Sequence, residues 1–483
     1  MPQLTLQRPG HAALGRWLTP TERDFIRLAT DPAFRRRLAQ LRQTGGCERP
    51  IHLTGHTTWF APNGSILRHY TTKGEPAERI AVRCGTRRAS RCEPCSRLHA
   101  GDTYQLVRAG LAGGKGIPAP AGHPMLFVTL TAPSFGAVHR SGRCRPQHQT
   151  TCDHGRPTGC GQHHAETAPE VGQPLCAACY DYNHHVLWHA HVGELWSRTV
   201  RIVRRRLATA ADIPRSRLGD HLQVAFAKVA EYQRRGAIHL HFVMRLDGPE
   251  GPESLPPSWA TEELLASSVN SASVTANVRS PDCASVGELV IRWGEQVDIR
   301  PIHSGPKEID REAVASYLAK YVTKSSSEGG DHPVKSMADL ASRPMPGHTR
   351  VLMRTCWRLG GLREFCHLKL RTWVHTMGFR GHVLTKSRAY STTYRQLREN
   401  RARHVGGYYP EGVRIEKEWR YAGAGLSLAE AEIASGIRHD VATRRDILRE
   451  VDPTLGIRRH ARQRPAQAPR YRSPEKERGP DRC

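Results

Sequence analysis

Long apolar runs are missing from this chain of 483 residues. No stretch of about 18 or more apolar residues occurs, and this excludes a membrane-spanning helix. The opening residues, MPQLTLQRPGHAALGRW, also lack the apolar core of a signal peptide. We therefore expect a cytoplasmic protein with no membrane partner.

Acidic side chains are too few to balance the basic ones. The chain carries 72 Lys and Arg against 45 Asp and Glu, which gives a formal net charge of +27 at pH 7. Such an excess favours a polyanionic partner, and nucleic acid is the usual one. A general preference for arginine in the proteome would explain why Arg outnumbers Lys, but not why basic residues outnumber acidic ones.

A complete phosphate-binding loop is absent as well. The stretch Gly113–Gly116, GGKG, lacks the spacing of such a loop and has no Ser or Thr after its lysine. We interpret it as a linker and expect no nucleotide cofactor.

Cysteine, by contrast, is plentiful, with 13 residues. In a reducing cytoplasm, cysteines are metal ligands or free thiols more often than disulfides. The pair Cys92 and Cys95 has the spacing that places two thiolates on one Zn²⁺, and Cys84 and Cys47 can complete a tetrahedral site. A redox pair is the alternative, but the two further cysteines and the many nearby arginines favour structural zinc.

Residues 137–182 form an insertion rich in Cys, His, Gly and Pro. Its apolar content is too low for it to fold alone, so a metal ion is expected to hold it. We predict a second zinc site whose ligands are Cys152, Cys160, Cys176 and Cys179, with His154 and His164 as substitutes. The alternative is a disordered loop with free thiols.

Residues 223–243 predict a β-hairpin, because two runs of strand-forming residues flank a short polar turn. Side chains alternate across a strand, so His239 and His241 point to one face while Leu240 points to the other.

Glu231 lies near this turn and can face both histidines across the pair of strands. Two imidazoles and one carboxylate form a site for a divalent cation with open positions. Gln233 is a rival third ligand, and an ordinary solvent-facing strand is the alternative to any metal site.

Residues 310–324 predict a helix that opens with acidic residues. Tyr317 and Tyr321 are four residues apart and share a face, as do Lys320 and Lys324. A phenol has a pKa of about 10, so it needs nearby positive charge or a metal-polarised target to act as a nucleophile. The alternative is a tyrosine packed in the core beside a solvated lysine stripe.

Three ordered motifs resemble those of the HUH endonucleases, and within them the rolling-circle replication initiators. They are the strand Phe127–Thr131, then Glu231 followed by His239-Leu240-His241, and then the two-tyrosine segment Tyr317–Lys324. More narrowly, the chain resembles the replication initiators of actinomycete plasmids and integrative elements, from roughly residue 47 to residue 393. The closer match rests on residues 84–95, 129–136, 174–182 and 378–388.

This resemblance implies a metal-dependent nuclease with an α+β fold, built on a central antiparallel sheet of the HUH endonuclease type with flanking helices. It implies that Mg²⁺ or Mn²⁺ binds to Glu231 and the two histidines while Tyr317 or Tyr321 attacks the origin DNA. One strand would be nicked, held as a 5′-phosphotyrosine and later re-joined. Lys320 and Lys324 would steady the charge, and a host helicase and polymerase would act next.

The chain is expected to divide into five regions. They are a basic N-terminal region (1–46), a Cys-rich zinc-binding module (47–116), a nuclease domain (117–330) with the zinc-ribbon-like insertion 137–182, a basic and mainly helical DNA-contacting region (331–455), and a disordered Arg/Pro-rich tail (456–483). Helices through Tyr104 and Leu111 and over His184–Ala210 are expected to lie against the sheet.

Residues 379–394 interleave cations, hydroxyls and aromatics. Cations neutralise phosphates and aromatics stack on unpaired bases, so this stretch predicts DNA contact. The candidates are Arg380, His382, Lys386 and Arg388; a solvated basic surface is the alternative.

Two other functions remain open at this stage. A relaxase or transposase would use the same chemistry on a different DNA substrate. A non-catalytic, zinc-dependent DNA-binding regulator would use the same basic surface, and its tyrosines would be structural.

Overall fold

The computed structural model describes residues 18–145, 150–302, 310–323, 332–406 and 412–451. Residues 1–17 of the predicted N-terminal region, the predicted tail 456–483 and the candidate Lys324 lie outside these ranges. Every helix in the described part of the chain is too short or too polar to cross a membrane.

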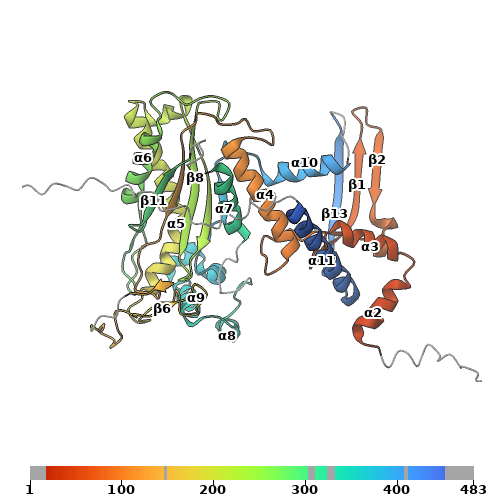
Figure 1. The fold of residues 1–483 in the computed structure, drawn as a ribbon, viewed down its shortest axis with the longest axis horizontal. Coiled ribbons are helices and arrows are strands. Elements are labelled where there is room, and N and C mark those ends of the chain that lie inside the picture. Colours follow the sequence, from red (N-terminus) through yellow and green to blue (C-terminus); the bar gives the residue numbers. More distant parts are fainter. Residues whose placement is uncertain (1–17, 146–149, 303–309, 324–331, 407–411, 452–483) are drawn as a thin grey trace, which may run out of the picture.

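A five-stranded antiparallel sheet forms the centre of the larger lobe (Figure 1). Its strand order is β11-β4-β8-β7-β12, and each neighbouring pair is antiparallel. The strands are β4 (Met125–Leu130), β7 (Gln223–Tyr232), β8 (Ile238–Asp247), β11 (Val297–Pro301) and β12 (Leu384–Lys386). The predicted central antiparallel sheet and the predicted β7–β8 hairpin are therefore both present.

Helices cover both faces of this sheet (Figure 1). The long helix α5 and helix α6 pack on one face, while α4 and α7 pack on the other. The predicted long helix and the predicted helix through Tyr104 are confirmed. The bounds are α4 (Glu93–Ala112), α5 (Tyr182–Ala210), α6 (Glu262–Thr275), α7 (Arg311–Thr323) and α9 (Gly347–Leu359).

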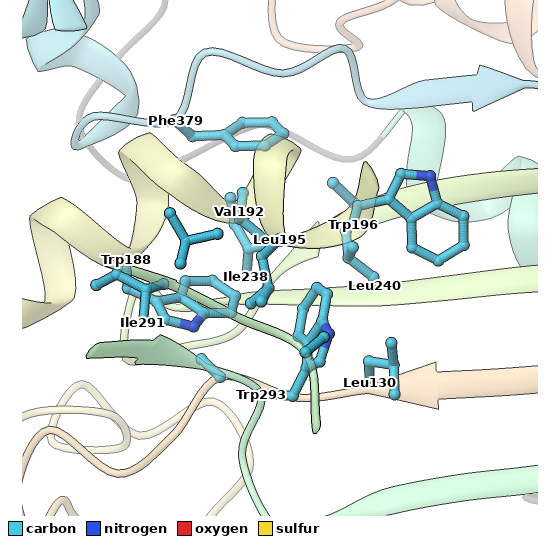
Figure 2. Packing of buried hydrophobic residues seen from close by; sticks show 14 of the residues in the cluster. Leu130, Trp188, Val192, Leu195, Trp196, Ile238, Leu240, Ile291, Trp293 and Phe379 are labelled. Carbon is cyan, nitrogen blue, oxygen red and sulfur yellow. The ribbon is translucent and has the colours of Figure 1, made fainter. Parts of the chain in front are cut away.

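The first face of β8 belongs to the larger hydrophobic core. Leu240 and Phe242 are fully buried there and belong to the same cluster as residues of helix α5. Figure 2 shows Leu195 and Trp196 of that helix next to Leu240. The Trp196 ring meets the Phe242 ring edge-on, with centroids 4.7 Å apart. Burying an aliphatic or aromatic side chain contributes about 1.5–3 kcal/mol, so this face fixes which residues of β8 point the other way.

The second face of β8 carries polar residues at alternate positions. His239, His241 and Arg245 lie on it, in line with the predicted alternation, together with the buried Val243. Arg245 donates from Nε and Nη2 to the two carboxylate oxygens of Asp247 at 2.6 and 2.8 Å, and also to the carbonyl of Gly110 in α4. The Arg245 side chain therefore joins β8 to helix α4 through its hydrogen bond to Gly110.

A second, smaller sheet combines the two ends of the described chain (Figure 1). Strand β1 pairs with β13 along its whole length and also with β2 and β3, and α11 packs on α2 and α3. These elements are α2 (Pro20–Ala29), α3 (Phe34–Gln43), β1 (Ile51–Phe60), β2 (Ile66–Thr71), β3 (Ile80–Val82), β13 (Arg414–Ala424) and α11 (Leu428–Val451).

The described residues of the region 331–455 are mainly helical, but they also contribute two strands. Strand β12 completes the central sheet and strand β13 completes the smaller one, so each strand pairs with a segment far away in the sequence. The remaining elements are β5 (Gly142–Arg143), β6 (His163–His164), β9 (Asn277–Arg279), β10 (Val290–Arg292), α8 (Met337–Ser342) and α10 (Tyr394–Gly406), with short 3-10 turns between them.

We predict that Arg245→Leu lowers the free energy of unfolding by about 3–5 kcal/mol, because it leaves the fully buried Asp247 carboxylate without its guanidinium partner. The double variant Arg245→Leu/Asp247→Leu should recover much of this loss. Urea unfolding measures both. The control is Arg279→Leu, which breaks the exposed pair with Glu288 and should cost less than about 1 kcal/mol. Equal losses in Arg245→Leu and Arg279→Leu would contradict the prediction.

Acid should destabilise the protein through buried histidines of α5. Burial lowers the pKa of His189 to about 3 and holds the pKa of His185 well below 6.5. Between pH 7 and 5 the unfolded chain gains protons at these residues and the folded chain does not, so stability falls as pH falls. The expected loss is up to about 2 kcal/mol per histidine.

Urea unfolding at pH 7 and pH 5 measures this loss. His189→Gln should reduce the difference between the two pH values, while His367→Gln, at an exposed position, should leave it unchanged. A pH dependence that is identical in all three proteins would show that His189 is not its source.

Candidate active site and metal-binding groups

The β7–β8 hairpin brings Glu231 to His241. Glu231 lies directly opposite His239 in the strand register, but its Oε2 is 3.0 Å from His241 Nε2 on the diagonal. The other nitrogen of His241, Nδ1, is 3.0 Å from the Thr129 hydroxyl on the neighbouring strand β4. Both sides of the imidazole are thus held, which fixes the orientation of its ring.

His239 lies closer to the turn and is half-buried. Burial and the neighbouring His241 lower the pKa of His239 to about 4, against the opposing effect of the Glu231 charge. The imidazole is therefore neutral at pH 7 and keeps a lone pair for a metal ion. The donor set of two imidazoles and one carboxylate fits a divalent cation.

The three side chains do not yet converge fully. Three groups among the described residues bring their ligand atoms within 4.8 Å of one another, and Glu231, His239 and His241 are not one of these groups. They would have to move closer to share a cation. The rival ligand Gln233 accepts a hydrogen bond from Arg235 Nε at 2.9 Å within the turn.

Helix α7 places both tyrosines over this face of the sheet. The ring centroid of His241 is 5.2 Å from that of Tyr317 and 5.4 Å from that of Tyr321, and the two tyrosine rings are 4.7 Å apart. Phe127 of β4 meets Tyr317 edge-on at 5.6 Å. Two phenols and the candidate cation ligands therefore share one small site at the contact of α7 with β4 and β8.

The tyrosine environments differ. Tyr317 is 37% exposed, whereas Tyr321 is half-buried against the second hydrophobic core, which lies between the sheet and helices α4 and α7. Burial is the main cause that raises the pKa of Tyr317, and the hydrogen bond with Tyr321 is the next. The negative charge of Glu231 adds to this rise, while the positive charge of Arg300 opposes it. The Tyr317 phenol is thus protonated at neutral pH and needs additional positive charge to become a nucleophile.

Positive charge is available next to the phenols. The ammonium group of Lys320 lies 5.5 Å from the centroid of the Tyr321 ring. Arg300, which the sequence motifs did not indicate, comes from strand β11 at the edge of the sheet. Its position could not be found from sequence because β11 joins the site only through its pairing with β4.

The first cysteine group has the predicted members. Cys47, Cys84, Cys92 and Cys95 converge, with Cys47 Sγ 3.8 Å from Cys92 Sγ and 3.6 Å from Cys95 Sγ. Zn–S bonds of about 2.3 Å give a tetrahedron with edges near 3.8 Å, so these thiols are spaced for zinc. Hydrogen bonds from Cys92 and Cys95 also hold the pKa of the Cys47 thiol far below its usual range, which favours the thiolate that zinc needs.

The predicted second ligand set is divided in the structure. Cys152, Cys176 and Cys179 converge with His154, which the sequence offered as a substitute, and Cys160 is not among them. Cys160 lies instead with His139, Cys144 and His164. The pairing of β5 with β6 is the physical reason, since it brings the chain around Cys160 beside Cys144.

The four candidate DNA contacts lie around strand β12. Arg380, His382 and Arg388 are exposed. Lys386 is half-buried, and its ammonium donates to the carbonyl of Ser391 at 2.9 Å. Burial lowers the pKa of Lys386. The ammonium of Lys386 therefore already holds the chain after β12 in place.

Known proteins resemble this chain over most of its length. A family model described as "RepSA: Replication initiator protein, pSAM2" matches residues 33–439. A protein of Streptomyces ambofaciens described as "Replication initiator protein" is 41% identical over 447 residues, which cover 88% of this chain and 95% of the relative. No solved structure matches.

We predict that Thr129→Val weakens Mn²⁺ binding by about tenfold to a hundredfold, because it removes the hydroxyl that holds the His241 ring. Paramagnetic resonance of free Mn²⁺, recorded on zinc-loaded protein, measures the affinity.

The matched control is Thr131→Val. The Thr131 hydroxyl lies just after the same strand but donates to the carbonyl of Gln296, so its removal should leave Mn²⁺ affinity unchanged. Equal effects of the two substitutions, or no binding of Mn²⁺ to the unmodified protein, would count against a cation site at His241.

Proposed function

Because the chain belongs to the RepSA family of replication initiator proteins, we propose that it starts rolling-circle replication of a plasmid or integrative element in the cytoplasm. It would nick one strand of its own origin DNA and act as an endonuclease of the HUH type. The observation that carries this proposal is the packing of both tyrosines against His241, Tyr317 edge-on and Tyr321 stacked. His241 is itself hydrogen-bonded to Glu231.

The reaction is a phosphoryl transfer to tyrosine. A bond forms between the phenol oxygen and the phosphorus of one phosphodiester, and the bond from phosphorus to the 3′ oxygen breaks. The phenol proton passes to solvent, and the departing 3′ oxygen takes up one proton. The product is a 5′-phosphotyrosine and a free 3′ hydroxyl, from which a host polymerase extends once a host helicase opens the duplex.

The covalent link also explains how the strand can be closed again. The phosphotyrosine conserves the energy of the original phosphodiester, so a 3′ hydroxyl can attack it without ATP. This agrees with the incomplete phosphate loop at Gly113–Gly116. With two tyrosines, one can hold the first cut end while the other cuts the regenerated origin.

The charges around the phenols support this chemistry. Mg²⁺ or Mn²⁺, held by Glu231, His239 and His241, would polarise the phosphate that is attacked. His239 would bind the cation as a neutral imidazole, because burial lowers its pKa to about 4. Arg300 counters the rise in the Tyr317 pKa, and Lys320 lies next to Tyr321. Lys324, the other predicted lysine, is proposed to act in the same way.

Tyr317 is the better candidate for the first attack. It is the more exposed of the two phenols and faces Phe127 and His241 at the sheet surface. Tyr321 packs into the second core and would act on the later strand. The exposed Arg380, His382 and Arg388 would hold flanking DNA phosphates, while Zn²⁺ in the cysteine groups would be structural.

We expect the double variant Tyr317→Phe/Tyr321→Phe to form no covalent adduct with single-stranded oligonucleotides that tile the origin, since phenylalanine has no oxygen to attack phosphorus. Tyr317→Phe alone should slow the first cut at least about tenfold more than Tyr321→Phe alone. Adducts are counted on a denaturing gel in the presence of Mn²⁺.

The control for these variants is Tyr421→Phe, an exposed tyrosine of β13 in the other sheet, which should form adduct normally. Omission of Mn²⁺ from zinc-loaded protein should abolish the adduct; a chelator is avoided because it would also remove zinc. An adduct that persists in the double variant would contradict the proposal. Binding of origin duplex without any adduct in the unmodified protein would favour a regulator.

A further inference from the structure

The insertion at residues 137–182 contains two groups of metal-ligand residues whose order along the chain is crossed. The ligands occur as four successive pairs. The first pair (His139, Cys144) joins the third pair (Cys160, His164), and the second pair (Cys152, His154) joins the fourth (Cys176, Cys179). Two ions bound in this order would tie each half of the insertion to the other.

The distances inside both groups fit tetrahedral zinc. Zn–N bonds of about 2.0–2.1 Å and Zn–S bonds of about 2.3 Å give edges of about 3.3–3.8 Å. In one group, His164 Nε2 is 3.2 Å from His139 Nδ1 and 3.3 Å from Cys160 Sγ. In the other group, His154 Nδ1 is 3.3 Å from Cys179 Sγ.

Further features identify the sulfurs as ligands. The backbone amide of Arg140 donates to Cys144 Sγ at 3.5 Å, a contact that favours thiolate. The cysteines of both groups are free thiols.

The described part of the insertion has almost no apolar core of its own. Between residues 137 and 179, Cys144 and Val171 are the buried apolar side chains among the described residues, and Cys144 is itself a candidate ligand. The regular structure there is the pair of two-residue strands β5 and β6. A segment with so little apolar burial needs another source of order, and metal ions supply it.

The insertion contacts the turn of the β7–β8 hairpin. Arg234 of that turn donates from Nη2 to the carbonyl of Glu166 at 2.8 Å. Gly172 adopts a φ of +92°, and a Cβ there would lie 2.5 Å from the carbonyl carbon of Arg234. Two backbones are therefore in direct contact a few residues from Glu231 and His239.

We propose that the insertion binds two Zn²⁺ ions in this crossed order and that the resulting module braces the hairpin turn beside the active site. With the Cys47 group, the described part of the chain then binds three zinc ions, one for each convergent group. The inference does not rest on nicking, because metal content and turn order are measured without DNA.

Double variants of the purified full-length chain test the crossing, with zinc per chain counted by native mass spectrometry. The unmodified protein should hold three zinc ions, one for each convergent group. Cys144→Ser/Cys160→Ser should lose one ion and Cys144→Ser/Cys152→Ser should lose two. Consecutive grouping of the ligands predicts the reverse. Cys366→Ser, at an exposed cysteine outside the groups, should lose none.

A second measurement works on the unmodified protein in case a variant fails to fold. Gradual removal of zinc with alkylation of released thiols should label Cys144 and Cys160 together, and Cys152, Cys176 and Cys179 together. Labelling of Cys160 together with Cys176 would overturn the crossed order, as would a zinc content of only one ion in the unmodified protein.

Hydrogen exchange tests the bracing. Cys179→Ser should speed amide exchange in the turn at residues 233–236 at least about tenfold relative to Cys366→Ser. Gly172→Ala should do the same with its zinc retained, whereas Gly219→Ala, at an ordinary φ with open space around it and outside the insertion, should not. Unchanged exchange in both Cys179→Ser and Gly172→Ala would refute the bracing role.

Discussion

Strand β8 is buried on both faces, and the alternation of its side chains determines which residues reach the candidate active site. Leu240 and Phe242 are fixed in the core beneath α5. A shift of one residue would place the histidines in that apolar core, at the cost of burying unpaired polar groups. The apolar face of β8 therefore determines that His239 and His241 lie on the opposite face, where His241 meets the tyrosines of helix α7.

The polar face of β8 needs partners, and the fold supplies them from several elements. Thr129 and Glu231 hold His241 from the strands on either side, while Asp247 and a carbonyl of α4 hold Arg245. The two ends of one strand thus serve different purposes. The Arg245 end joins the sheet to α4, whereas the histidine end is left with two phenols above it and a brace from the insertion at its turn.

The sequence was most informative where structure is local. The hairpin, its alternation and the tyrosine face of α7 follow from residues a few positions apart, and the first cysteine group follows from one knuckle with its neighbours. Segments that meet only through distant pairing were not predictable. Strand β12 is three residues long within a basic segment, and β13 finds its partner β1 at the other end of the chain. The sequence placed Cys160 in the other ligand group. Strands of two residues leave no recognisable pattern in a sequence, so the pairing of β5 with β6 could not be predicted.

The most direct test identifies the peptide that carries DNA. An adduct formed with an origin oligonucleotide would be digested with nuclease and trypsin and examined by mass spectrometry. Cleavage after Arg311 and Lys320 places Tyr317 and Tyr321 on different peptides, so each attachment has its own mass. Nucleotide mass on Glu312–Lys320 or on Tyr321–Lys324 is the result that this account predicts. Nucleotide mass on any other peptide would contradict the assignment of the α7 tyrosines as nucleophiles.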